Sequence, residues 1–103
     1  MRIYISIPFD RNNFGKAHQV VEGYRSFLGE KDKVFVSPFD MAPCVDAPLP
    51  YNVSRRIEAL LQCDEVLMMK GWEHDKICAL EREAAIRFGK VVTYEESRHE
   101  SIS

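Results

Sequence analysis

The chain has 103 residues, of which 46% are hydrophobic and 29% are charged, and its formal net charge at pH 7 is -2. This length and composition fit a single globular domain over residues 1–103 and exclude a disordered or fibrous chain. The longest apolar runs, such as residues 66–69, are far shorter than the about 20 residues that cross a bilayer, so no membrane is expected as a partner. Beyond Arg55 and Arg56 there is no basic cluster, so nucleic acid is not expected either.

The cysteines Cys44, Cys63 and Cys78 lack the paired spacing of a metal or redox motif and favour reduced thiols that pack in the core. The first residues do not form the apolar region and cleavage site of a signal peptide. We therefore expect a cytoplasmic protein.

The first forty residues predict a strand, a helix and a second strand. Residues 2–8 are rich in β-branched and aromatic side chains and end at a proline, which is typical of a buried strand. Apolar residues then recur at spacings of three and four over 13–28 and indicate a helix that ends before Gly29. Residues 33–38 form a second short β-type run. Residues 37–54 contain Pro38, Pro43, Pro48 and Pro50, and we expect them to form a long loop, either a binding lid or a linker.

The second half of the chain continues this alternation. We predict a helix, a strand, a helix and a strand, over residues 53–61, 65–70, 75–88 and 90–94. Gly71 ends the third strand, residues 72–74 form a loop, and the polar tail over 95–103 is expected to fray. Strands that alternate with helices predict an α/β fold with a parallel sheet, whose ligands bind beyond the carboxyl ends of the strands. That edge comprises residues 6–13, 37–51 and 70–75.

Glu81 is the residue that does not fit its predicted helix. On a helical wheel it falls within an apolar stripe formed by Ile77, Leu80, Ala84, Ala85 and Phe88. A buried carboxylate requires a hydrogen-bond donor, a cation or a raised pKa, and this requirement is common at functional sites. The alternative is a structural Glu that caps a loop or pairs with an arginine.

Each of three residues at or just before the start of this helix also has two interpretations. Asp75 fits an N-cap of the helix, and it also borders the predicted ligand edge. Trp72 could stack on a planar ring or cover the open end of the core. His74 has the chemistry of a proton carrier but lies alone in a loop, and His18 and His99 are weaker candidates.

The sequence contains no glycine-rich dinucleotide fingerprint, phosphate loop, metal-spaced histidine cluster or nucleophile elbow, so no cofactor and no metal are expected. Three segments together resemble the nucleoside 2-deoxyribosyltransferase-like family, and in particular its short bacterial and phage branch. They are MRIYISIPF at the start, IEALLQCDEVLMMKGWE in the middle and ALEREAAIRFGKVVTY near the end, so the resemblance covers nearly the whole chain.

The resemblance implies a flavodoxin-like, three-layer fold with a short parallel sheet of about four strands in the order 2-1-3-4. It also implies a nucleoside or nucleotide as the small-molecule partner, and a homo-oligomer. Glu81 occupies the position of the nucleophile that attacks the anomeric carbon and forms a covalent glycosyl-enzyme. The residues expected to bind substrate are Tyr4, Ser6, Arg56, Gly71, Trp72 and Asp75.

Two departures from the family pattern bear on this expectation. Ile77 and Cys78 stand where the family commonly has small residues beside the nucleophile, which predicts a narrowed pocket. Arg56 stands where active members have an Asp that binds the sugar hydroxyl. Arg56 could meet a phosphate, or it could pair with Glu81 and disarm it. The first hypothesis is therefore transfer or hydrolysis of an N-glycosidic bond, and the alternative is a non-catalytic nucleotide-binding module that has kept the fold.

Overall fold

The structure, a computed structural model, describes residues 1–8, 14–28, 33–41 and 49–95. The predictions for Cys44, His99, most of the tail and part of the proline-rich segment lie outside these residues. The described elements alternate along the chain as β1 (Arg2–Ser6), α1 (Phe14–Leu28), β2 (Val34–Val36), η1 (Pro38–Met41), α2 (Leu49–Leu61), β3 (Glu65–Met68), η2 (Trp72–His74), α3 (Lys76–Arg87) and β4 (Val91–Tyr94), where η marks a short 3₁₀ helix.

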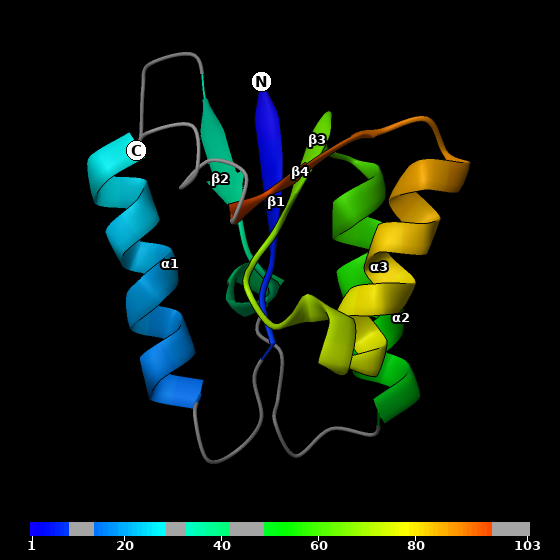
Figure 1. Cartoon of the computed structure of the whole chain (residues 1–103), viewed down its shortest axis with the longest axis horizontal. Helices are drawn as coiled ribbons and strands as arrows, with labels where there is room; N and C mark the ends of the chain where they lie inside the picture. The colour runs from blue at the N-terminus through cyan, green and yellow to red at the C-terminus, as the bar shows by residue number, and fades with distance from the viewer. Residues whose placement is uncertain (9–13, 29–32, 42–48, 96–103) are drawn as a thin grey trace.

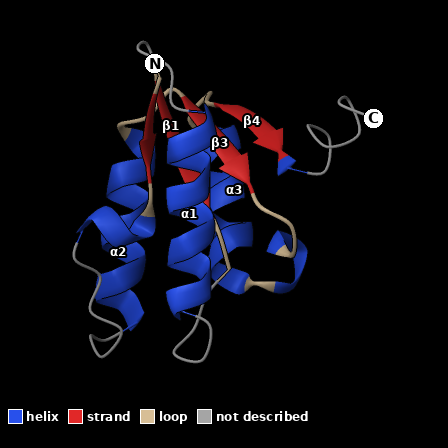
Figure 2. Cartoon of the chain, turned by 90° about the vertical axis from the view of Figure 1, so that its left-hand side faces the viewer, coloured by secondary structure: helices blue, strands red, loops and turns tan. Residues whose placement is uncertain are grey.

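The four strands form one parallel sheet in the order β2-β1-β3-β4, as predicted. Helix α1 covers one face of the sheet, and α2 and α3 cover the other, which gives three layers (Figure 1). Figure 2 views the sheet from the α1 side. The fold is therefore the expected α/β arrangement, and the order of its strands reverses between β1 and β3.

Side chains of β1 alternate between the two faces of the sheet, because successive residues of a strand point in opposite directions. Ile3, Ile5 and Ile7 pack in the core beneath α1, together with Val21. Tyr4 packs in the second core, beneath α2 and α3, and Ser6 is also fully buried. The second core also contains Ala59, Leu60, Cys63, Val66, Met68, Cys78 and Ala85. Cys63 and Cys78 are thus buried free thiols, as expected for packing residues.

The prediction that residues 37–54 form only a loop is wrong. Pro38 begins η1, and α2 begins at Leu49 with Pro50 in its first turn. Proline is compatible with the first turn of a helix, because its missing N–H would have no partner within the helix there and its φ angle already suits the helix. Residues 72–74, also expected as a loop, form η2.

The apolar stripe predicted for α3 is correct for Ala85 but wrong for Leu80 and Phe88, which are 48% and 66% exposed. Phe88 is the C-cap residue, so it lies past the last full turn. Cys78, Glu81 and Ala85 are instead the buried residues of α3. Their spacing of three and four places Glu81 in the centre of the buried face.

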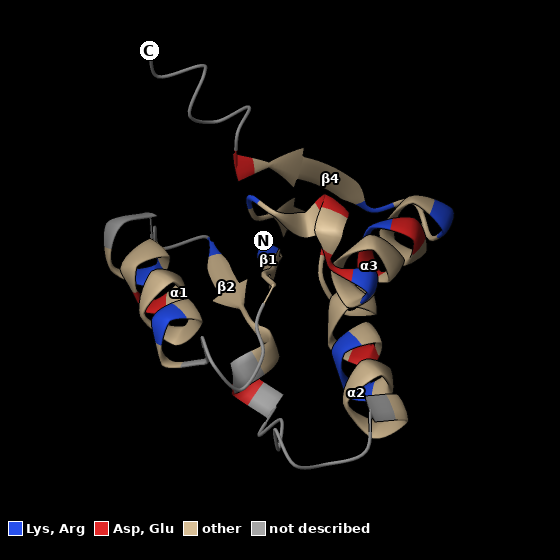
Figure 3. Ribbon diagram, turned by 60° about the horizontal axis from the view of Figure 1, so that its bottom comes forward, with Lys and Arg blue, Asp and Glu red and all other residues tan. Residues whose placement is uncertain are grey.

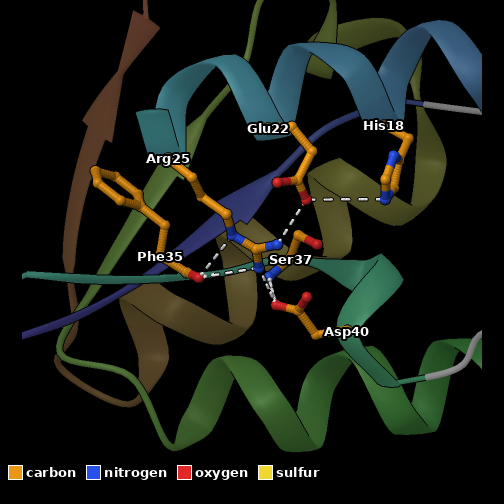
Figure 4. Close-up of polar contacts among 6 residues, drawn as sticks. All are labelled: His18, Glu22, Arg25, Phe35, Ser37 and Asp40. Carbon is orange, nitrogen blue, oxygen red and sulfur yellow. Dashed lines mark hydrogen bonds and ion pairs between the residues drawn. The ribbon is translucent and has the colours of Figure 1, made fainter. Parts of the chain in front are cut away.

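A polar cluster ties α1 to β2 and η1 (Figure 4). The guanidinium of Arg25 donates to the carbonyl oxygen of Phe35 from Nε at 3.3 Å and from Nη2 at 3.1 Å, and it pairs with Glu22 and Asp40. Asp40 also accepts a 2.8 Å hydrogen bond from the backbone N–H of Ser37. The cluster therefore fixes the chain where it leaves β2. Charged residues of both signs are interspersed along the three α-helices (Figure 3).

Truncation of Leu67 should test the core beneath α1. Leu67 is fully buried in β3, so Leu67→Ala should lower the free energy of unfolding by about 2–5 kcal/mol because it removes apolar contacts and leaves a cavity. Urea denaturation measures this loss. Leu80→Ala is the matched control and should change the stability by less than about 0.5 kcal/mol. Equal losses in the two variants would contradict the described packing.

Candidate active site

Glu81 lies at the centre of a buried polar cluster between the sheet and the two helices on its second face. Tyr4 and Ser6 reach it from β1, and Arg56 reaches it from α2. The side chain of Glu81 is 0% exposed and that of Arg56 is 4% exposed. Tyr4 and Ser6 share a face because they are two residues apart on one strand. Three secondary-structure elements therefore meet at one carboxylate.

Both oxygens of Glu81 accept two hydrogen bonds each. Oε1 accepts from the Ser6 hydroxyl at 2.8 Å and from Nη2 of Arg56 at 2.9 Å. Oε2 accepts from the Tyr4 hydroxyl at 2.5 Å and from Nε of Arg56 at 3.1 Å. A guanidinium can only donate hydrogen bonds, so its bidentate contact requires both carboxylate oxygens to act as acceptors. The cluster thus holds a carboxylate with its hydrogen-bonding capacity filled.

Burial and the neighbouring charge act in opposite directions on the pKa values of Glu81 and Arg56, but burial and the charge of Glu81 act in the same direction on the pKa of Tyr4. Burial raises the pKa of Glu81, whereas Arg56 and the hydrogen bonds from Tyr4 and Ser6 oppose this rise. Burial also raises the pKa of Tyr4, and the negative charge of Glu81 adds to this effect. Burial by itself would lower the pKa of Arg56, but the charge of Glu81 and the interactions with Tyr4 and Cys78 together outweigh burial, so the pKa lies above its ordinary value. The buried charges therefore depend on one another.

Asp75 is the N-cap of α3, as one of its two interpretations predicted. Its Oδ1 accepts hydrogen bonds of 2.9 Å from the backbone N–H groups of both Ile77 and Cys78. The cap orients the first turn of the helix that carries Glu81. The side chain of Cys78 is fully buried in the second core.

Gly71 and Trp72 form the turn between β3 and α3. Gly71 has a φ of +94°, which other residues rarely adopt, and a Cβ atom there would lie 3.7 Å from Cγ of Pro8. Trp72 packs against the second core, with its ring centroid 5.8 Å from that of Tyr94. The guanidinium carbon of Arg82 lies 5.1 Å from the Trp72 ring. This packing agrees with the interpretation that Trp72 covers the open end of the core.

A cleft of about 340 Å³ opens at the carboxyl ends of β1 and β3, where the strand order reverses. This is the place at which open α/β sheets bind ligands. It lies on the α1 side of the sheet, and its lining comprises Ile7, Pro8, Lys16, Ala17, Val20, Met69, Lys70, Gly71 and Glu95. Both lysines give the cleft positive charge beside an apolar wall. Glu95 accepts from the backbone N–H of Lys70 and from the hydroxyl of Tyr24.

The structure thus brings together only some of the predicted site residues. Tyr4, Ser6, Arg56 and Glu81 form the buried cluster, and Gly71 lines the cleft. Sequence reasoning missed Lys16, because α1 was not among the segments assigned to the ligand edge; Lys70, by contrast, lies within that edge. Among the described side chains, no group of three or more His, Cys, Asp and Glu residues is arranged to hold a metal ion. None of the described helices is both long and apolar enough to span a membrane.

Comparison with solved structures identifies a protein of the same fold. The 2-desoxiribosyltransferase from Leishmania mexicana matches with a TM-score of 0.70 and 22% sequence identity over 90% of this chain. The chain has a nucleoside 2-deoxyribosyltransferase-like fold. It spans 62% of the length of that Leishmania chain. No protein-family model and no curated protein sequence matches it.

Removal of one partner of the buried ion pair should cost more stability than removal of both. Arg56→Met leaves the Glu81 carboxylate without its cation, so the free energy of unfolding should fall by about 3–5 kcal/mol. The double variant Arg56→Met, Glu81→Met removes both charges and should recover part of this loss. Chemical denaturation of the single and double variants measures the coupling. Strictly additive losses would show that the two side chains do not interact.

Stability should fall as the pH rises above the ordinary pKa of a thiol, about 8.5. Burial raises the pKa of Cys78 to about 12, opposed by a hydrogen bond with Ser6. Between these values the unfolded chain loses a proton that the folded chain retains, so this stabilising contribution declines with rising pH by up to about 1.4 kcal/mol per pH unit. Burial of Tyr4 and Cys63 acts in the same direction.

Urea denaturation at a series of pH values from about 7 to 10.5 tests this contribution in the wild type and in Cys78→Ala. The variant should show a shallower decline in stability with pH, because the contribution of one buried thiol has been removed. The slopes are compared at a fixed salt concentration. Identical slopes would contradict the assignment of a raised pKa to Cys78.

Proposed function

We propose that this protein transfers or hydrolyses the N-glycosidic bond of a nucleoside or nucleotide, with Glu81 as the nucleophile. The observation that carries the proposal is an inward-facing carboxylate on α3, held by Tyr4 and Ser6 of the central strand within a nucleoside 2-deoxyribosyltransferase-like fold. The Leishmania protein of the same fold is, by its name, a transferase of deoxyribosyl groups. A carboxylate nucleophile suits that chemistry because it can stabilise and then capture an oxocarbenium-like centre.

The proposed reaction has two displacements at the anomeric carbon. An oxygen of Glu81 forms a bond to this carbon, while the bond from the carbon to the base nitrogen breaks and its electron pair stays on the base. The base takes up a proton from solvent, and the sugar remains as an ester of Glu81. A second base or a water molecule then attacks the anomeric carbon, loses its proton, and restores the Glu81 carboxylate.

The other predicted residues have roles that follow from their positions. Tyr4 and Ser6 donate to Glu81 and would orient its oxygens toward the sugar. The substrate would approach beyond the carboxyl ends of β1 and β3, where Gly71 lies, and would have to reach Glu81 from the α2 and α3 side, because the sheet separates Glu81 from the cleft beneath α1. Trp72 and Asp75, at the same edge, would contact the base or sugar. We also expect a cytoplasmic homo-oligomer, because the sheet has two edge strands, β2 and β4, that offer backbone groups for pairing.

Mechanism-based labelling of Glu81 tests the proposed reaction. Incubation of the full chain with a 2-fluoro-2-deoxy nucleoside, or with its 5′-monophosphate, should add the mass of the fluorinated sugar, and peptide mapping should locate it on Glu81. A panel of nucleosides and monophosphates should release free base, measured by chromatography. Glu81→Gln should lower this release by roughly a thousandfold or more.

Glu83→Gln is the matched control for this substitution. Glu83 lies on the same helix, but its side chain is 52% exposed and pairs only with Arg87 among the ion pairs described for it. Its replacement should leave labelling and base release unchanged. If neither labelling nor base release occurs over the whole panel, glycosyl transfer is excluded. Thermal stabilisation by nucleotides without turnover would then favour the nucleotide-binding module.

A further inference from the structure

Glu81 has no lone pair available for nucleophilic attack in the described arrangement. An ionised carboxylate offers about four acceptor positions. Ser6, Tyr4 and the two nitrogens of Arg56 fill them at distances between 2.5 and 3.1 Å. Attack on an anomeric carbon requires one lone pair directed at that carbon. One of the donors must therefore move before the proposed reaction can begin.

Arg56 is the donor best able to move. Tyr4 and Ser6 belong to β1, which is paired with β3 at both residues and with β2 at Tyr4, so the sheet fixes their backbone positions. Arg56 reaches the cluster from α2 through a long side chain with several rotatable bonds. Its departure would free one acceptor position on each oxygen of Glu81, whereas the departure of either hydroxyl would free only one oxygen.

Only a strong anion can draw a buried guanidinium away from a carboxylate. Separation of the pair leaves a buried charge, which is costly unless another partner replaces it. A phosphate monoester carries up to two negative charges and accepts two parallel N–H bonds from arginine. A neutral nucleoside offers no such group. Once Glu81 has formed a glycosyl ester it is uncharged, so it no longer requires the cation.

We propose that Arg56 blocks the carboxylate of Glu81 in the resting state and that the phosphate of a nucleoside monophosphate draws Arg56 away from it. We call this arrangement the latch. This inference rests on the proposed glycosyl transfer and identifies the substrate as a phosphorylated nucleoside. Arg56 exchanges its two N–H bonds from the carboxylate to phosphate oxygens, and no proton is transferred in this step. The latch makes Arg56 a positioning and specificity-determining residue, because it couples phosphate binding to the exposure of the nucleophile.

Labelling rates test the latch. The 5′-monophosphate of a 2-fluoro-2-deoxy nucleoside should label the wild type at least about tenfold faster than the nucleoside itself, a preference equivalent to about 1.4 kcal/mol. In Arg56→Gln this preference should fall toward unity, with faster labelling by the nucleoside than in the wild type. Arg55→Gln, which replaces the exposed neighbouring arginine, is the matched control and should keep the wild-type ratio.

Inorganic phosphate supplies the anion separately from the sugar. Millimolar phosphate should accelerate labelling of the wild type by the nucleoside at constant ionic strength, but not labelling of Arg56→Gln. The Nε–H resonance of Arg56, assigned by its absence in Arg56→Gln, provides a readout that does not require turnover. It should shift when the wild type is titrated with a natural deoxynucleoside monophosphate, and it should not shift with the nucleoside.

The outcomes separate the latch from the reaction on which it rests. Labelling with the same monophosphate preference in the wild type and Arg56→Gln would overturn the latch and leave the proposed function standing. The complete absence of labelling would overturn both. If Arg56→Gln does not fold, Arg56→Lys replaces it, and its single ammonium should give a smaller preference than the wild type. An unchanged Arg56 resonance at saturating nucleotide would also overturn the latch.

Discussion

The constraint on which the rest of this structure depends is the burial of a carboxylate at the centre of an apolar layer. Glu81 faces the sheet from α3, so the neighbouring elements must supply hydrogen-bond donors to it. Tyr4 and Ser6 supply two from the central strand, and Arg56 supplies two from α2. These bonds join both helices to the same strand. The packing of the second face is therefore specified by hydrogen bonds as well as by apolar contact.

The contact between Arg56 and Glu81 stabilises the fold and also restricts the chemistry open to the carboxylate. A guanidinium on both oxygens compensates for the cost of burying the carboxylate, and it also occupies the lone pairs that a nucleophile needs. An aspartate at position 56 would not have this effect, because it cannot donate to Glu81 when ionised. Arg56, which stands where the family resemblance led us to expect an acceptor, is thus the resting partner of Glu81.

The end of β1 connects the polar cluster to the cleft. Ser6 points to the second face of the sheet and donates to Glu81, whereas Ile7, the next residue, lines the cleft on the α1 side. The reversal of strand order between β1 and β3 creates this cleft, because the neighbouring crossovers leave the sheet on opposite sides. The cleft and the carboxylate therefore lie on opposite faces of the sheet and share only the end of β1.

Local patterns predicted most of the fold. Runs of β-branched residues identified the strands, and their alternation with helices implied a parallel sheet, while the order 2-1-3-4 came from the family resemblance and is confirmed. The prolines led to the wrong prediction of a loop over residues 37–54, because the effect of a proline depends on its position in a helix. Pro50 is accommodated in the first turn of α2. The wheel correctly placed Glu81 inside, but it also placed Leu80 and Phe88 inside, since periodicity does not show where a helix ends or which neighbours cover it.

By itself, the sequence indicated that one carboxylate faces inward on the last helix, because its neighbours at helical spacing are apolar. It left open whether Arg56 meets that carboxylate or a phosphate. Only the tertiary structure decided the resting partner, because Arg56 and Glu81 are 25 residues apart and their meeting depends on how α2 and α3 pack against β1. The cleft between β1 and β3 was likewise decided by the packing of α1 and the strand order, which no local pattern encodes.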